Sequence, residues 1–341
     1  MTPNSDTRGL PRQTGLMVEL PGQCSLACAY CYAGRKGDKE TGWAAFADRL
    51  NDLVGQLAGQ ENTGDGPLQL GVLGGIEPLS NFEALARTVE IVDEGMGNRE
   101  CHRYIATSGY GTATQVNWLA SRFDAVSVSL DGPQQVHNSQ RRTGAGDPTH
   151  DSAQRAALIV KSWGGKLLIR STITSMNVEL LSGMVASFAD TYEPVEIRFE
   201  PVYRLGVGNP LRPREGTFVK NFLKALEVSE KLGVRLVYPG FSVENGGRPF
   251  CNSLRGVVFL DGRGETGSCM FGEDVAPEGA TSVLPEPSIC LECPARNRCS
   301  RGCPDLCLWA LKDPEKILFE SWRCRVIRAL AEALQLGRGS S

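Results

Sequence analysis

The chain has 341 residues, of which 41% are hydrophobic and 22% charged, a composition typical of a globular protein. A formal net charge of −3 gives no electrostatic basis for nucleic acid as a main partner. No apolar run approaches the roughly 18 residues of a membrane span, and no secretion signal is visible, so we expect a cytoplasmic protein with no membrane partner.

Strand and helix patterns alternate along the first two thirds of the chain. Strands are predicted at 16–20, 68–73, 104–107, 125–130, 166–173, 195–202 and 234–238. Helices are predicted at 42–57, 81–94, 115–123, 151–163, 178–189 and 218–232. This alternation indicates parallel βα units and an α/β fold. It suits a partial (β/α)6 barrel and a doubly wound open sheet equally well. The polar stretch 143–149 is predicted to be an exposed loop.

Twelve cysteines are the most informative residues of the chain. Without an export signal they favour metal ligation over a disulfide framework. Cys24, Cys28 and Cys31 form the run CSLACAYC, with Tyr30 before the third cysteine. Three thiolates on one short loop can hold three irons of a [4Fe–4S] cubane and leave the fourth iron open to a small molecule.

This run resembles the cluster loop of the radical S-adenosylmethionine (SAM) enzymes, which carry an aromatic residue at the position of Tyr30. The resemblance makes Tyr30 a candidate cofactor contact. The resemblance favours the partial barrel over the open sheet. It implies that a reduced cluster on the three cysteines chelates SAM and cleaves it to a 5′-deoxyadenosyl radical. It also implies an external one-electron reductant such as flavodoxin or ferredoxin.

The C-terminal cysteines form a second group, and Cys101 stands alone as a predicted buried thiol. The group comprises Cys251, Cys269, Cys290, Cys293, Cys299, Cys303, Cys307 and Cys324. Its spacing resembles the SPASM extension of radical SAM enzymes, which houses two auxiliary [4Fe–4S] clusters. The resemblance assigns Cys290, Cys293, Cys299 and Cys324 to the outer cluster. It assigns Cys251, Cys269 and Cys303 to the inner cluster, with Cys307 as a candidate fourth ligand. Structural zinc is the alternative for such pairs.

Ligands in parallel α/β folds bind at the carboxyl ends of the strands, where several motifs fall. The turn of Gly74, Gly75, Ile76, Glu77 and Pro78 resembles the family's Gly-Gly-Glu-Pro turn, with Ile76 inserted. In the family this turn meets the amino group of SAM, which implies contacts from Gly74, Gly75 and Glu77. The glycines allow close backbone approach, and a carboxylate accepts from an ammonium.

Further candidate SAM contacts follow the next strands. Thr107 lies where the family often has Thr-Asn-Gly, and Ser129 and Asp131 end the fourth predicted strand. The resemblance makes Ser129 and Asp131 candidates for contacts with the ribose hydroxyls or for the surroundings of the SAM carboxylate. It makes Arg141 a candidate partner of that carboxylate. The alternative is an ordinary turn and a solvated arginine. Arg198 and Glu200 share a face of the sixth strand, where they would pair with each other, meet substrate or point outward.

Together these features divide the chain into four parts. Residues 1–15 are predicted to be extended or disordered, 16–240 a radical SAM barrel, 245–330 a SPASM domain and 331–341 a tail.

The expected activity is a net two-electron oxidation at a C–H bond. We favour dehydrogenation of a small polyhydroxylated or aminocyclitol-type intermediate, with modification or crosslinking of a peptide side chain as the close alternative. Epimerisation and a non-catalytic iron–sulfur scaffold are further alternatives. Sulfatase-maturing members carry an acidic residue after the cysteine that matches Cys269, whereas this chain has Met270, which argues against formylglycine formation.

Overall fold

The structure, a computed structural model, describes residues 15–31, 42–59, 67–202, 211–243, 257–267, 288–299 and 322–338. Their strands form a nine-stranded sheet in the order β7-β6-β5-β4-β3-β2-β1-β8-β9. All neighbouring pairs are parallel except β8 and β9. The strands are β1 (Gly15–Val18), β2 (Leu68–Val72), β3 (Cys101–Thr107), β4 (Ala125–Ser129), β5 (Lys166–Ile173), β6 (Glu196–Pro201), β7 (Arg235–Val237), β8 (Val257–Leu260) and β9 (Thr266–Gly267).

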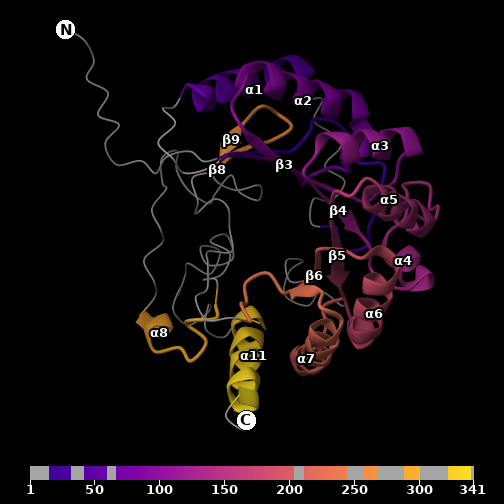
Figure 1. The fold of residues 1–341 in the computed structure, drawn as a ribbon, viewed down its shortest axis with the longest axis vertical. Helices are drawn as coiled ribbons and strands as arrows, with labels where there is room; N and C mark the ends of the chain where they lie inside the picture. The colour runs from indigo at the N-terminus through magenta and orange to yellow at the C-terminus, as the bar shows by residue number, and fades with distance from the viewer. Residues whose placement is uncertain are drawn as a thin grey trace.

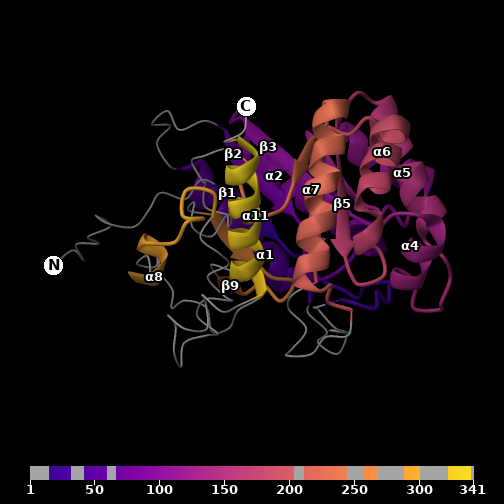
Figure 2. The same cartoon turned by 90° about the horizontal axis from the view of Figure 1, so that it is seen from below.

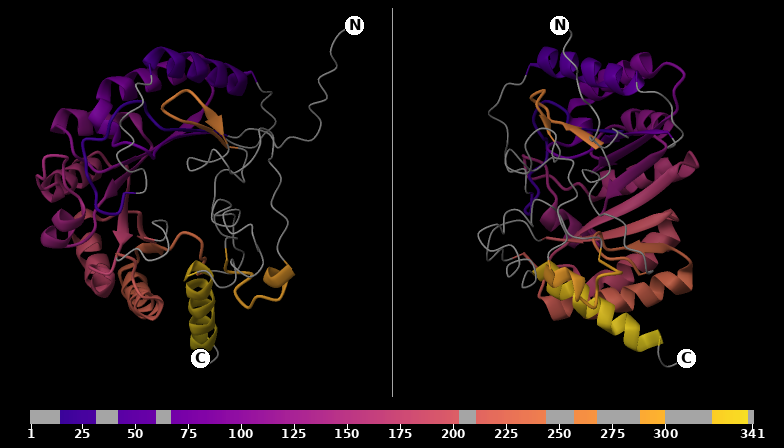
Figure 3. Two further views of the ribbon diagram at one scale, coloured as in Figure 1. Left: turned by 180° about the vertical axis from the view of Figure 1, so that it is seen from behind. Right: turned by 90° about the vertical axis from the view of Figure 1, so that its left-hand side faces the viewer.

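The sheet curves into an arc with helices along its outer side (Figure 1). The helices are α1 (Trp43–Ala58), α2 (Phe82–Met96), α3 (Ala113–Arg122), α4 (Gln134–Gln140), α5 (His150–Ser162), α6 (Leu181–Tyr192), α7 (Glu215–Leu232), α8 (Ser288–Leu291) and α11 (Trp322–Arg338). Short 3₁₀ helices at Pro78–Asn81 and Val178–Leu180 precede α2 and α6. The arc, which is also seen from behind in Figure 3, confirms the partial barrel and excludes a sheet covered by helices on both faces.

Strand alternation explains how one sheet supplies both a core and a site. In β5, Leu167, Ile169 and Ile173 are buried, whereas Arg170 and Thr172 between them are half-buried. The buried set faces the helices, because successive side chains of a strand point to opposite faces. The other set lines the barrel interior, which therefore carries the polar groups that a substrate site needs.

One local feature differs from the sequence prediction. A short helix, α4, follows the predicted turn at Asp131, with Pro133 at its N-cap position. The stretch 143–149 is a loop, as predicted, and residues 144–148 are exposed. Thr143 and Thr149 at its two ends are buried, at 5% and 1% exposed.

The strand β8 joins the barrel sheet from a distant part of the chain. It pairs with β1 in parallel, from Gly15 opposite Val257 to Val18 opposite Leu260. Its residues lie in the range 245–330 that the sequence assigns to the SPASM domain, so that segment contributes a strand to the barrel. The hydrogen bond from the Glu19 N–H to the Leu260 carbonyl, 2.8 Å long, continues this pairing toward the site.

The C-terminal helix α11 packs beside α7, as seen from below in Figure 2. The indole N–H of Trp322 donates to the Pro213 carbonyl at 3.1 Å, and its ring lies 5.6 Å from that of Phe218. The helix continues to Arg338, through most of the range predicted as a tail. No helix among the described residues is long and apolar enough to cross a membrane.

Candidate active site

The three-cysteine loop lies at the carboxyl end of β1 and is held by backbone hydrogen bonds to the segment 140–144. The N–H groups of Ala27 and Ala29 donate to the carbonyls of Arg142 and Gln140 at 2.7 and 2.9 Å. The Gly144 N–H donates to the Ser25 carbonyl at 2.8 Å. The loop therefore has a strand-like partner that holds its backbone in place, independently of any metal.

The thiols of this loop are suited to iron. Cys24 is exposed and its Sγ accepts the Glu77 N–H at 3.3 Å, while Cys28 and Cys31 are half-buried. Burial raises the pKa of the Cys28 thiol to about 11, against the opposing effect of the Arg141 guanidinium. Metal binding must therefore displace the thiol proton, as it does in thiolate sites generally. Three soft sulfur donors on one loop fit an iron–sulfur cluster.

The described side chains do not converge as ligands of one ion do. In the part of the chain that the structure describes, no three Cys, His, Asp or Glu side chains meet in a group that could hold a metal ion. A cubane binds each thiolate through a different iron, so this finding does not argue against a cluster on the loop.

Glu77 of the predicted SAM-binding turn is 6% exposed and is engaged within the protein. Its Oε1 accepts the Thr107 hydroxyl and, at 3.2 Å, the Leu79 N–H. Its Oε2 accepts the Ser108 N–H at 2.6 Å. Burial raises the pKa of this carboxyl, while the same donors lower it. The side chains of Glu77 and Thr107 therefore join the turn after β2 to the end of β3.

The glycine turn itself is a close approach between backbone and side chain. Gly75 has a φ of 45°, and a Cβ there would lie 1.4 Å from the Glu19 carboxylate Oε1. Glycine is required, because any side chain would displace Glu19. Glu19 follows β1, where alternation places it on the barrel interior with Met17. The sequence prediction missed Glu19, although alternation along 16–20 could have placed it.

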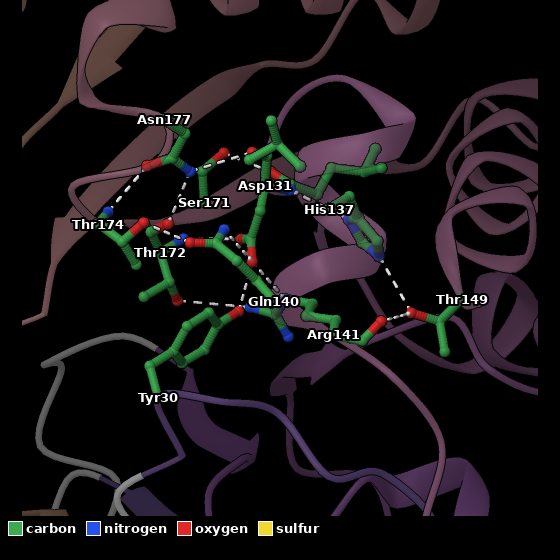
Figure 4. Close-up of polar contacts among 12 residues, drawn as sticks. Tyr30, Asp131, His137, Gln140, Arg141, Thr149, Ser171, Thr172, Thr174 and Asn177 are labelled. Carbon is green, nitrogen blue, oxygen red and sulfur yellow. Dashed lines mark hydrogen bonds and ion pairs between the residues drawn. The ribbon is translucent and has the colours of Figure 1, made fainter. Parts of the chain in front are cut away.

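Asp131 is at the centre of a buried hydrogen-bond network (Figure 4). It is 0% exposed, and its Oδ2 accepts the Tyr30 hydroxyl at 2.5 Å and the Arg141 Nε–H at 2.9 Å. Gln140 also donates to Oδ2 at 3.3 Å, and the Thr172 N–H donates to Oδ1 at 2.9 Å. Both carboxylate oxygens of Asp131 accept hydrogen bonds, so this side chain links the cluster loop to the end of α4 and to β5.

The three predicted contacts Tyr30, Asp131 and Arg141 therefore lie together. The Arg141 guanidinium carbon is 5.3 Å from the centre of the Tyr30 ring, a cation–π distance, and the residue is 9% exposed. Ser129 is half-buried on the interior of β4, opposite Arg170 of β5 in the strand register. The sequence prediction missed Gln140, because α4 was not foreseen.

His137 is a structural residue of the same network. It is 1% exposed; its Nδ1 accepts the Asp131 N–H at 3.2 Å, and its Nε2 lies 3.1 Å from the Thr149 hydroxyl. That hydroxyl donates to the Arg141 carbonyl at 2.9 Å, so Nε2 carries the hydrogen. Burial lowers the pKa of His137 to about 4, opposed by Asp131 and assisted by Arg141 and His150.

The neutral state of His137 makes stability depend on pH. Between pH 6.5 and 4 the unfolded histidine binds a proton that the folded one does not, so stability falls as the pH falls. From pH 7 to pH 5 the metal-free wild type should lose about 2 kcal/mol more than H137N. Urea unfolding at both pH values measures this difference, and parallel losses in the two proteins would contradict the assignment.

The interior of β5 and β6 carries two ion pairs. The Arg198 guanidinium donates to Glu196 at 2.6 Å, and the Arg170 Nε–H donates to Glu200 at 2.7 Å. Arg198 and Glu200 share the interior face as predicted, but each pairs with another residue. A further ion pair joins Arg235 to Glu196 at 3.0 Å. The interior face of β5 and β6 is thus lined by charged side chains that are partly exposed.

Four of the C-terminal cysteines, Cys290, Cys293, Cys299 and Cys324, lie in the described residues and are half-buried. The Cys293 N–H donates to the Cys290 carbonyl at 3.3 Å, the same turn that joins Cys31 to Cys28 at 3.1 Å. The backbone of Cys299 forms an isolated antiparallel β-bridge with that of Phe241, and Cys324 lies on α11. The candidates Cys251, Cys269, Cys303 and Cys307, and also Met270, lie outside the described residues.

The partial β/α barrel, whose first strand leads into a three-thiol loop, is the arrangement that the resemblance to radical SAM enzymes implies. The family described as a 4Fe-4S single cluster domain matches residues 16–155. The cysteine-type anaerobic sulfatase-maturating enzyme of Clostridium perfringens is 26% identical over 170 residues, covering 49% of this chain and 45% of that protein. The chain is therefore similar to an iron–sulfur cluster domain and to a sulfatase-maturating enzyme over parts of its length.

Solved structures share the fold over most of the chain. Native anSMEcpe with bound AdoMet and Cp18Cys peptide has a TM-score of 0.69 at 17% identity, covering 96% of this chain and 98% of that one. Streptococcus suis SuiB bound to the precursor peptide SuiA has a TM-score of 0.64 at 15% identity, covering 89% and 74%. The chain spans about half the length of the curated relatives it matches, 56% and 45% for two of them.

Proposed function

We propose that this chain is a radical SAM enzyme that oxidises a side chain of a peptide or protein substrate. The observation that carries the proposal is the match to a sulfatase-maturating enzyme, which is 26% identical over 170 residues. The fold likeness to structures solved with AdoMet and peptides supports it. These relatives favour the peptide alternative over the aminocyclitol-type metabolite that the sequence suggested first.

In this proposal Cys24, Cys28 and Cys31 hold the [4Fe–4S] cluster, and SAM binds inside the barrel at the carboxyl ends of the strands. When bound, the two cofactors supply a 5′-deoxyadenosyl radical that removes a hydrogen atom from the substrate. Cys290, Cys293, Cys299 and Cys324 are the proposed ligands of an outer auxiliary cluster. Cys251, Cys269, Cys303 and Cys307 are the proposed ligands of an inner one, which would accept the second electron.

The protein's own part is to exclude water and position the substrate. The ion pairs Arg170–Glu200 and Arg198–Glu196 line the barrel interior next to Ser129 in the strand register. Charged side chains on a concave wall offer hydrogen bonds to the amide groups of an extended peptide. With Met270 in place of an acidic residue, we expect a product other than formylglycine.

The proposal is tested with anaerobically reconstituted protein, SAM and dithionite. We expect 5′-deoxyadenosine, formed faster in the presence of an accepted peptide. We would then test a panel of peptides, each deuterated at the β-carbon of a single residue, with the cysteine-labelled peptide tested first. We expect deuterium to reach 5′-deoxyadenosine from only one of the labelled residues.

Three outcomes separate the alternatives. Deuterium transfer from a peptide supports the proposal. Transfer only from a deuterated aminocyclitol would overturn the peptide assignment and restore the small-molecule activity. No 5′-deoxyadenosine from protein with a full cluster would instead support an electron-transfer scaffold.

A further inference from the structure

The polar contacts around Asp131 lead from the cluster loop into the barrel wall (Figure 4). Tyr30, one residue before Cys31, belongs to the loop, whereas Thr172 belongs to β5 and Arg141 follows α4. A single carboxylate accepts from all three, at 2.5, 2.9 and 2.9 Å. The Arg141 side chain makes a second link, because its Nη2 donates to the Thr172 hydroxyl at 3.4 Å while its guanidinium lies over the Tyr30 ring.

The position of Asp131 is itself fixed by its backbone. Its N–H donates to His137 at 3.2 Å, and its carbonyl accepts the Asn177 side-chain N–H at 3.0 Å. The same Asn177 amide donates to the Thr172 carbonyl at 3.0 Å. The carboxylate is therefore held rigidly before the loop contacts it, which reduces the entropy cost of ordering Tyr30.

We propose that Asp131 is a positioning residue that holds the cluster loop in its metal-binding form through the Tyr30 hydroxyl and keeps Arg141 over the Tyr30 ring. This assigns Asp131 a role other than the SAM contact expected from the sequence. The inference deepens the proposed function, because it concerns the loop on which the cluster is proposed to assemble. It predicts an ordered loop in the metal-free protein.

The variants D131N and Y30F test this link. In D131N one oxygen can still accept the Thr172 N–H, but an NH₂ group replaces the acceptor of Tyr30 and Arg141. Y30F removes the hydroxyl and leaves the ring beneath Arg141. D151N is the matched control, because Asp151 lies on α5 near the same network and its side chain is 80% exposed.

The readout is the rate at which the Cys28 thiol of metal-free protein is alkylated, followed by peptide mass spectrometry. Losing a hydrogen bond to a charged group should raise this rate about tenfold to a hundredfold in D131N, with a smaller rise in Y30F. Because Tyr30 acts through Asp131, the double variant should be labelled no faster than D131N. Cys101, half-buried at the start of β3, reports global loosening and should keep its wild-type rate.

A second readout uses the loaded protein. The electron paramagnetic resonance signal of the reduced SAM-binding cluster should change on adding SAM, and D131N should need about tenfold more SAM for the same change. Three outcomes would each overturn the inference. The alkylation rate of Cys28 could be the same in D131N as in D151N, or it could rise in D131N no more than the rate of Cys101 does. The third outcome is that the effects of D131N and Y30F on the Cys28 rate add up in the double variant. If the signal of the wild-type cluster did not change with SAM, the proposed function would be overturned. The labelling rates would still test whether Asp131 holds the cluster loop.

Discussion

Replacing Cys28 by serine is expected to abolish the formation of 5′-deoxyadenosine by the reconstituted, reduced enzyme. Serine is close to cysteine in size, but it has no sulfur and therefore offers no thiolate to iron. One of the three proposed cluster ligands is lost. Cys28 lies between Ala27 and Ala29, whose N–H groups are bonded to the segment 140–144, so the loop backbone should persist in the variant. The loss is measured as 5′-deoxyadenosine after incubation with SAM and dithionite.

The matched control is Cys101→Ser. This cysteine is also half-buried, but it lies at the start of β3, at the opposite end of the strand from the site. The control should retain wild-type 5′-deoxyadenosine formation and iron content. Full activity in the Cys28 variant, or equal loss in both variants, would contradict the assignment of Cys28 as a ligand.

Replacing Glu77 by glutamine is expected to lower the free energy of unfolding of the metal-free protein by about 3 kcal/mol. The carboxylate accepts from the Thr107 hydroxyl and the N–H groups of Ser108 and Leu79. An amide NH₂ in place of one oxygen would face a buried donor, leaving both without an acceptor. Urea unfolding monitored by circular dichroism measures the change.

Glu83→Gln provides the comparison for this substitution. Glu83 lies on α2, its side chain is 75% exposed, and it pairs with Arg87 at 2.9 Å. Its replacement should change stability by less than about 0.5 kcal/mol. Equal unfolding midpoints for the two variants would show that the Glu77 network does not stabilise the fold.

The limits of sequence prediction are clearest at Glu77 and Asp131. Both were placed at the carboxyl ends of strands and assigned to SAM by resemblance. In the fold, Glu77 bonds to Thr107, 30 residues away, and Asp131 bonds to Tyr30, 101 residues away. Position in a motif indicated where these side chains lie, but not which groups they contact. The contacts depend on the register of β2 with β3 and of β4 with β5.

The segment 143–149 is a second example. Its composition of glycine, threonine, aspartate and proline predicts an exposed loop, and residues 144–148 are exposed. Its partner, the cluster loop, lies more than 100 residues earlier in the chain. Backbone hydrogen bonds between distant segments carry no side-chain signature. The pairing of Leu26 with Thr143 was therefore invisible to sequence patterns.

The sequence by itself determined the alternating strands and helices and the three-thiol loop, because hydrophobic periodicity and ligand spacing are properties of short stretches of chain. Only the tertiary structure decided that β8 extends the barrel next to β1, and that Glu77 and Asp131 are engaged inside the protein. The physical reason is that strand pairing and buried hydrogen bonds join residues whose proximity exists only once the sheet has formed.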